Sequence, residues 1–355
     1  MPSRPVDVLI VGQGLAGSLL AWELIRQQAR VMVIDSGETN ASQVAAGLIN
    51  PVTGKRLVKA AEIEQLLPAA MDCYQQLALA FKQQFFVPIP MVRLLKSEHE
   101  RHIAQQRLVQ AEYQAFLTDE PSCPPGINSA FGVLQQLQTG YIKIRQLLKC
   151  LQDFFVANGC YRQARLDYRE IMFQPHLQWQ DWQPRHIVFC EGHQGTVNPW
   201  FGKLPFQPVK GEILYCKTQA VSPIRILNFG YWMIPTEPHQ FRLGATFDYT
   251  NLDTQPTERA RHQLIQALTE VYPGLHPVEI VEHQAGIRPA TQDKRPFIGS
   301  HPVYRHLHIF NGFGAKGSLA IPWYAQQFAA ALNQAASIPD TVHVRRYYDS
   351  HFPSA

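Results

Sequence analysis

Three glycines near the start of the chain, Gly12, Gly14 and Gly17, have the spacing of a loop that binds a nucleotide diphosphate. In such a loop the first glycine permits a tight turn, the second lets a diphosphate approach the backbone, and the third lets a helix pack closely on a strand. Asp35 follows roughly 20 residues later, where a carboxylate accepts a hydrogen bond from a ribose hydroxyl. Together these residues predict a dinucleotide site. The alternative is an ordinary strand–helix–strand unit without a ligand.

The segments around this turn have the composition that such a site requires. Residues 6–11 and 31–35 are apolar runs of strand length, and residues 18–25 form an apolar run of helix length. Unpaired N–H groups at the start of such a helix favour a phosphate. In this unit the residues expected to line the ligand are Gly12, Gly14, Leu15, Ala16, Gly17, Asp35 and Ser36.

A second set of glycines, Gly312, Gly314 and Gly317, repeats the spacing between a strand-like and a helix-like run. No acidic residue ends another strand about 20 residues later, where Ala335-Ala336-Ser337 stands, so a second dinucleotide is not predicted. We expect a helix N-terminus directed at another part of the same ligand, where it and Lys316 would stabilise negative charge. The alternative is a close helix–strand contact that needs small residues.

Length and composition describe a globular protein. The chain has 355 residues, of which 46% are hydrophobic and 17% charged, enough for a full core and two domains. Its net charge of +4 is too small by itself to imply a nucleic-acid partner. The six cysteines form no CxxC pair and the histidines no ligand pattern, which predicts reduced thiols, a cytoplasmic location and no metal site. We expect no export signal and no transmembrane span.

Hydrophobic spacing predicts the remaining elements. Helices are expected over residues 62–86, 98–116, 146–158, 256–271 and 318–333, and an edge strand broken by prolines over 87–96. Two short strands are expected near 164–173 and 176–180, and a longer one ends at Cys190. Strand-like runs between residues 209 and 247 predict a mixed or antiparallel sheet. The small residues of 36–56 suit either a backbone lying against a large planar group or a flexible surface loop.

These motifs resemble the D-amino-acid oxidase-like family of FAD-dependent oxidoreductases. The family includes glycine oxidase, sarcosine oxidase and the FAD domain of the bifunctional enzyme that forms methylaminomethyl-uridine in tRNA. The resemblance covers nearly the whole chain and is carried by residues 12–35, 42–47, 209–212, 286–299 and 311–317. It implies an α/β fold (α+β overall), with a Rossmann-type FAD-binding domain (1–72, 139–204 and 286–355) and a mixed-sheet substrate domain (73–138 and 205–285).

The resemblance also implies the positions of the ligands. FAD would extend along the first glycine turn, and Arg288 would bind a substrate carboxylate beside the flavin, unless it only structures the turn before Pro289. Tyr231 matches a strand that lines the substrate side, although a lone aromatic residue is nearly as suited to the core. The further residues expected at FAD are Ser42, Ala45, Ala46, Gly47, Cys190, Glu191, Gly192, Asn311, Gly312, Gly314, Ala315, Lys316 and Gly317.

Two departures from the family pattern concern the cofactor and the substrate. Glu191 places a carboxylate where FAD passes, and Ala315 stands where glycine-oxidase-like members carry a second arginine. A clamp of two arginines, and with it a simple glycine-like substrate, is therefore not evident.

Three functions follow as hypotheses. The first is oxidation of a C–N bond in a small amine or amino acid, with oxygen or another electron acceptor. The second is oxidation of a modified nucleoside in tRNA, for which Arg345-Arg346-Tyr347-Tyr348 offers a basic, stacking segment. The third is an FAD-binding interaction module that has lost turnover. The sequence predicts no membrane partner and gives no oligomeric state.

Overall fold

The computed structural model describes residues 4–119, 125–220, 224–333 and 335–352. The chain forms two compact units. The first comprises Met1–Gln43, Ile144–Val209 and Ile287–Ala355, and the second comprises Val44–Lys143 and Lys210–Gly286. The assignment of FAD to one domain and of substrate to the other stays a prediction.

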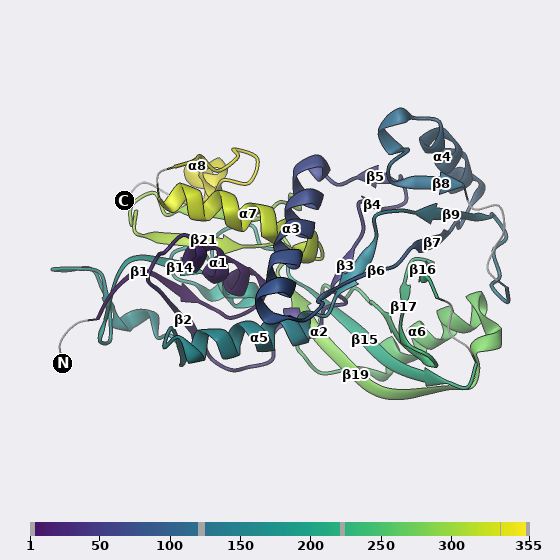
Figure 1. Cartoon of the computed structure of the whole chain (residues 1–355), viewed down its shortest axis with the longest axis horizontal. Helices are drawn as coiled ribbons and strands as arrows, with labels where there is room; N and C mark the ends of the chain where they lie inside the picture. Colours follow the sequence, from purple (N-terminus) through teal and green to yellow (C-terminus); the bar gives the residue numbers. More distant parts are fainter. Residues whose placement is uncertain (1–3, 120–124, 221–223, 334, 353–355) are drawn as a thin grey trace. The chain divides into compact units, whose positions relative to one another are not determined.

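The first unit is built on a mainly parallel sheet in the order β11-β2-β1-β14-β21-β20 (Figure 1). Within this order all neighbours are parallel except β20 and β21, and β14 also pairs in antiparallel orientation with a short strand at Gln178–Trp179. The apolar runs of the sequence become β1 (Arg4–Val11), β2 (Val31–Asp35), β14 (Trp182–Phe189) and β21 (Leu307–Asn311). The other two strands are β11 (Tyr161–Gln163) and β20 (Phe297–Ser300). In register, Val11 lies opposite Ile34 and Phe189, and Phe189 lies opposite Ile309. The carboxyl ends of these four strands therefore share one edge, where such sheets bind ligands.

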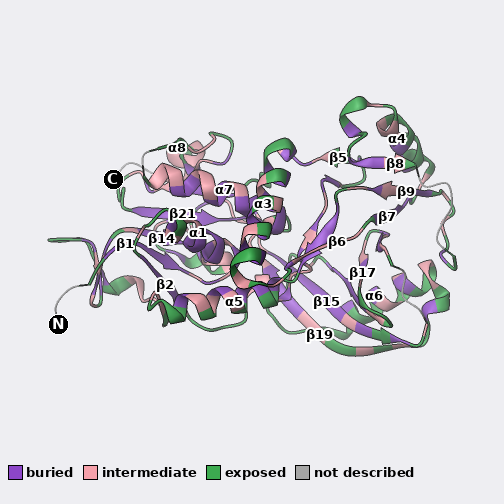
Figure 2. Ribbon diagram, viewed as in Figure 1, coloured by how far each residue is buried: buried purple, intermediate pink, exposed green. Residues whose placement is uncertain are grey.

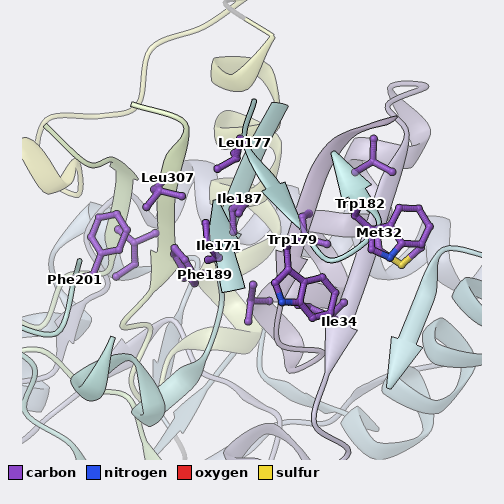
Figure 3. Packing of buried hydrophobic residues seen from close by; sticks show 14 of the residues in the cluster. Met32, Ile34, Ile171, Leu177, Trp179, Trp182, Ile187, Phe189, Phe201 and Leu307 are labelled. Carbon is purple, nitrogen blue, oxygen red and sulfur yellow. The ribbon is translucent and has the colours of Figure 1, made fainter. Parts of the chain in front are cut away.

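Helices α1 (Leu15–Arg26), α5 (Ile144–Ala157) and α7 (Gly317–Leu332) belong to this unit, and α1 packs against both of the others. A large apolar cluster takes most of its side chains from the strands of this sheet, including the short antiparallel strands β12 (Ile171–Met172) and β13 (Gln178–Trp179). Figure 3 shows part of this cluster, with Trp182 and Trp179 towards one end and Phe201 at the other. The short α8 (Tyr348–His351) ends the described part of the chain.

The second unit contains an eight-stranded sheet in the order β19-β15-β18-β17-β16-β7-β9-β8. Helix α6 (Glu258–Val271) packs one face of it, contributing Leu264 and Leu268 to a cluster with Leu214, Phe241 and Leu243. In Figure 2 the strands of this sheet carry many buried residues, while α6 has exposed residues on its outer side. The strands are β7 (Met91–Leu94), β8 (Leu117–Asp119), β9 (Val133–Gln136), β15 (Val209–Thr218), β16 (Ile226–Asn228), β17 (Trp232–Glu237), β18 (Gln240–Gly244) and β19 (Val278–Arg288).

The rest of the second unit consists of two small sheets and two helices. Strands β3 (Leu48–Ile49), β10 (Gly140–Ile142) and β6 (Phe86–Pro88) form one sheet, and β4 (Val52–Thr53) pairs with β5 (Val58–Lys59). The helices are α3 (Ile63–Phe81) and α4 (Glu98–Leu108). The short α2 (Ala41–Val44), which precedes β3, belongs to the first unit except for Val44.

The expected fold class is confirmed, and several local predictions are corrected. The single edge strand predicted over 87–96 is wrong, because β6 ends at Pro88, Ile89-Pro90 separates it from β7, and β7 is an interior strand between β16 and β9. The helix predicted over 98–116 ends at Leu108, and a short 3₁₀ turn (Ala111–Tyr113) leads into β8. The strand expected at 164–173 forms only at its end, as β12.

Candidate active site and cofactor site

The first glycine turn is packed so tightly that two of its residues must be glycine. Gly12 has a φ of +104°, and a Cβ there would lie 2.6 Å from the carbonyl oxygen of Cys190. A Cβ on Gly17 would lie 1.9 Å from the carbonyl oxygen of Gly12. The turn thus rests on the end of β14 on one side and on α1 on the other, as the spacing of the motif predicts.

Gly14 is glycine for a different reason. It is the N-cap of α1 and makes no side-chain capping bond, and a Cβ there would lie 3.3 Å from Ser42 Oγ and 3.9 Å from Asn40 Oδ1. The Ser42 Oγ accepts a hydrogen bond from the Leu15 N–H (3.0 Å), so Ser42 and Leu15 lie together at this helix end. The first turn of α1, with Ala16, has no acidic residue. A helix N-terminus of this kind suits a diphosphate.

Asp35 lies at the same edge. Its Oδ2 accepts from the Gln13 N–H (2.7 Å) and its Oδ1 from the Gly37 N–H (2.8 Å). A carboxylate offers about four acceptor sites, so both oxygens can still accept from ribose hydroxyls. The adjacent Ser36 accepts from the Glu38 N–H. Sequence reasoning missed Gln13, whose backbone holds Asp35 and whose side-chain amide donates to Ser18 Oγ and Leu148 O.

The second glycine turn is joined to the end of β14. Asn311 Nδ2 donates to the carbonyl oxygen of Gly192 (2.8 Å), and Asn311 Oδ1 accepts from the Gly312 N–H (2.8 Å). Gly312 has a φ of +84°, and a Cβ there would lie 2.7 Å from Thr291 Cγ2. The structure therefore brings Gly12, Cys190, Gly192 and Asn311 together along one edge of the sheet.

Helix α7 begins directly after this turn. Lys316 is its N-cap, no side chain caps it, and its first turn holds no acidic residue. Partial desolvation, with the like charge of Lys294, lowers the pKa of Lys316. The turn also contains Gly314, with a φ of +55°, Ala315, which is exposed, and Gly317, the first residue of the helix. This is a second helix end suited to negative charge.

Three of the expected cofactor residues, Ala45, Ala46 and Gly47, belong to the second unit. Gly47 has a φ of +73°, and a Cβ there would lie 2.2 Å from the carbonyl oxygen of Ile142. Its own carbonyl oxygen accepts from the Ile142 N–H (2.9 Å). Ala46 packs against a cluster that contains Met91 and Tyr141. The small residues of this stretch are thus ordered against the three-stranded sheet.

The two residues expected at the substrate have different surroundings. Arg288 is the last residue of β19 and is partly buried, and its carbonyl oxygen accepts from the Ala290 N–H (2.9 Å). Tyr231 packs against the cluster under α6, and its hydroxyl accepts from Gln263 Nε2. The neighbouring Trp232 packs instead in the clusters on the opposite face of the sheet. Strand alternation, which places adjacent residues on opposite faces, accounts for this difference, and the assignment of Tyr231 to the substrate side stays a prediction.

The Val209–Glu212 motif forms a buried polar network in the second unit. The Lys210 ammonium group is 1% exposed and donates to Asp253 Oδ1 and to the carbonyl oxygen of Gln255. The Glu212 carboxylate accepts from the N–H and hydroxyl of Thr257, the N-cap of α6. This motif therefore anchors the loop before α6 and the start of the helix.

Comparisons with known proteins decide the family. The family model described as FAD dependent oxidoreductase matches residues 7–331. This chain belongs to that family. It is therefore an oxidoreductase whose cofactor is FAD. Glycine oxidase of Pseudomonas putida is 23% identical to it, over 94% of this chain and 96% of the relative.

A second relative is larger than this chain. The tRNA 5-methylaminomethyl-2-thiouridine biosynthesis bifunctional protein of Idiomarina loihiensis is 20% identical over 92% of this chain but only 55% of its own length. Among solved structures, glycine oxidase from Geobacillus kaustophilus superposes with a TM-score of 0.81 and 19% identity, over 95% of this chain and 96% of that one. Iminodiacetate oxidase from a Chelativorans species superposes with a TM-score of 0.76 and 20% identity, over 94% of this chain and 97% of that one. These structures share the fold.

The residues of this oxidoreductase fit FAD. Gly14 has no side chain to obstruct a diphosphate, the first turn of helix α1 has one N–H bonded to Ser42 Oγ and no acidic residue, and Asp35 offers acceptors for ribose hydroxyls. In the described ranges no helix is long and apolar enough to cross a membrane. The same residues include no group of three or more His, Cys, Asp or Glu side chains that could hold a metal ion.

Proposed function

We propose that this FAD-dependent oxidoreductase oxidises a C–N bond in a small amine or amino acid. The observation that carries the proposal is Arg288, a partly buried arginine at the end of β19, in a chain whose relatives include glycine oxidases. Arginine presents a planar fork that matches a carboxylate bidentately. FAD, held at the first glycine turn and by Asp35, would supply the hydride acceptor for this oxidation, and the imine product would be hydrolysed by water.

The chain's own residues bind and orient the reactants. Arg288 would hold the carboxylate of an amino acid, which fixes the position of the α-carbon. Lys316 and the N-terminus of α7 would stabilise negative charge near the flavin, since both are positive and no acidic residue of the first helical turn opposes them. We further propose a cytoplasmic protein, in keeping with the free thiols of the five described cysteines.

The segment that favoured an RNA substrate has internal partners. The Arg346 guanidinium pairs with Asp293 (3.0 Å) and donates to four backbone carbonyl groups. Tyr347 and Tyr348 donate their hydroxyls to Asp293 and to the carbonyl oxygen of Ser300, and Arg345 pairs with Asp340. The observation behind the RNA hypothesis therefore has a structural explanation, and we do not propose that function.

The absorption spectrum of the purified protein tests the proposal. Amines and amino acids are added anaerobically, and a substrate bleaches the flavin bands. Admission of oxygen, followed by assay of hydrogen peroxide, distinguishes an oxidase from an enzyme that uses another acceptor. Flavin bands that no compound in a broad panel bleaches would contradict the proposal and favour a module without turnover.

The variants Arg288→Ala and Arg288→Lys test the carboxylate contact. We expect Arg288→Ala to raise KM for an amino-acid substrate by roughly 100-fold, the equivalent of about 2–3 kcal/mol for a charged hydrogen bond. Lysine should recover only part of the loss, because it lacks the planar fork. The matched control is Arg305→Ala, which removes an exposed arginine of the same unit. An unchanged KM in Arg288→Ala would remove the assignment.

A further inference from the structure

The carboxyl group of Glu191 has no part in the proposed reaction. Glu191 follows β14 and is partly buried. Its Oε1 accepts from the Tyr168 hydroxyl (2.8 Å), and its Oε2 accepts from Asn198 Nδ2 (2.8 Å). Asn198 Oδ1 in turn accepts from the N–H groups of Trp200 and Phe201. One carboxyl group therefore joins three segments of the first unit.

The backbone that carries this carboxyl group contacts both glycine turns. A Cβ on Gly12 would lie 2.6 Å from the carbonyl oxygen of Cys190 and 3.5 Å from the Cα of Glu191. The carbonyl oxygen of Gly192 accepts from Asn311. Since the diphosphate of FAD binds over the Gly12–Gly14 turn, the charge of Glu191 lies within roughly a side-chain length of the turn that receives it.

No described cation compensates this charge. Among the described residues, no lysine or arginine forms an ion pair with Glu191. The ionisable neighbours Tyr168 and Cys190 are neutral at pH 7, because burial raises the pKa of each well above its ordinary value. Burial likewise lowers the pKa of His193, in the 3₁₀ helix Gly192–Val197 that directly follows Glu191, so that it too is neutral at pH 7. Ionised Glu191 would therefore add to the negative charge of a bound diphosphate.

The hydrogen bonds around Glu191 accommodate both protonation states. Asn198 Nδ2 can only donate, and it donates to Oε2 in either state. A hydroxyl group both donates and accepts, so a proton on Oε1 can be donated to the Tyr168 Oη. Burial raises the pKa of Glu191 to about 7, although the hydrogen bonds from Asn198 and Tyr168 act to lower it. The side chain can thus change its charge near neutral pH without losing its contacts.

We propose that FAD binding is linked to uptake of a proton by Glu191, which holds the cofactor as a neutral carboxylic acid. One proton from solvent converts the carboxylate to the acid as the diphosphate binds, and no other bond changes. By linkage, a ligand that favours the protonated state binds more tightly as the pH falls. The inference rests on FAD as the cofactor and not on the identity of the substrate.

FAD titrations of the apoprotein of the full chain test this inference. Flavin fluorescence gives the Kd from pH 6 to pH 8.5, and calorimetry at pH 8 in two buffers of different ionisation enthalpy gives the protons taken up. For the wild type we expect the Kd to rise up to about tenfold over this range, which is one pKa unit of linkage. Proton uptake at pH 8 should then be roughly 0.4 per FAD, because a pKa one unit above about 7 leaves about half of the bound form protonated, against about a tenth of the free protein.

The variant Glu191→Gln separates charge from structure. Its amide can donate to Tyr168 and accept from Asn198, so the contacts remain while the charge is lost. We expect a Kd that is independent of pH, equal to the wild-type value at pH 6, with no proton uptake. The matched control Glu170→Gln changes an exposed glutamate on the 3₁₀ helix Tyr168–Glu170, which also carries Tyr168, and should behave as wild type.

Two outcomes overturn the inference. One is a wild-type Kd that is the same at pH 6 and pH 8.5. The other is a Glu191→Gln protein that keeps the wild-type pH dependence and proton uptake. Neither measurement involves an amine, so failure of the proposed reaction would leave this result unaffected, and the reverse also holds.

Discussion

Replacement of Gly17 by alanine tests how the first glycine turn is packed. The added Cβ would lie 1.9 Å from the carbonyl oxygen of Gly12 and 3.2 Å from the Cβ of Cys190. The first contact is with backbone, so no rotamer change relieves it, and either the turn or α1 must move. Overpacking costs up to about 3 kcal/mol, whereas alanine in place of a helical glycine gains about 1 kcal/mol. We expect a net loss of about 2 kcal/mol.

Thermal unfolding of the apoprotein measures this loss. At about 2–4 °C per kcal/mol for a unit of this size, the Tm of Gly17→Ala should fall by roughly 4–8 °C. The control Gly274→Ala adds a Cβ only 3.8 Å from the Tyr272 ring, an ordinary contact, and should not change the Tm. A Gly17→Ala apoprotein with the wild-type Tm would refute the packing argument.

Gly14→Ala gives the opposite result by the same reasoning. Its Cβ would lie 3.9 Å from Asn40 Oδ1, an ordinary contact, and 3.3 Å from Ser42 Oγ, which a small shift of that side chain relieves, so the Tm of the apoprotein should change by less than roughly 2 °C. The methyl group would stand where the diphosphate approaches, and the Kd for FAD should rise at least about tenfold. Fluorescence titration with FAD measures it. Wild-type affinity in Gly14→Ala would show that the diphosphate does not approach this residue.

Two further predictions concern buried polar groups of the first unit. Arg346→Ala should lower the free energy of unfolding by about 2–3 kcal/mol in urea, because it removes the ion pair with Asp293 and the hydrogen bonds to four carbonyl groups. The exposed Arg345→Ala should cost under about 1 kcal/mol, and equal effects of the two variants would contradict the assignment. Burial, with the charges of His186 and His306, lowers the pKa of His308 to about 3. The neutral imidazole therefore contributes to the free energy of unfolding in full above pH 6.5, and this contribution is lost as the pH falls from 6.5 toward 3. At pH 5 the wild type should have lost about 2 kcal/mol of this free energy of unfolding. Urea unfolding at pH 7 and pH 5 measures the loss, which the variant His308→Gln should not show. A variant with the pH dependence of the wild type would contradict the prediction.

Much of the first unit could be predicted because its signals are local. Apolar runs on either side of a glycine turn specify strand, turn and helix, and Gly12, Gly17 and Asp35 occupy the positions that the motif predicts. The helices α5, α6 and α7 form close to their predicted ranges, because hydrophobic spacing reports which face is buried, whereas α3 ends at Phe81 and not at residue 86 as predicted. The error at residues 87–96 arose where sheet membership, which depends on distant strands, decides the structure.

What the sequence determined by itself was the type of cofactor site, since a diphosphate needs glycine backbone and a helix end at fixed spacing. Tertiary structure alone decided which side chains serve it. Asn311 meets Gly192, and Tyr168 and Asn198 meet Glu191, only because the parallel strands end at one edge of the sheet. Similarly, the pairing of β17 with its neighbours decides which of Tyr231 and Trp232 packs on the face of the sheet that α6 covers and which packs on the opposite face. Hydrogen bonds between residues more than 100 positions apart, such as that from Asn311 to Gly192, leave no pattern in a single sequence, because nothing in the local order of residues encodes which distant segment lies alongside.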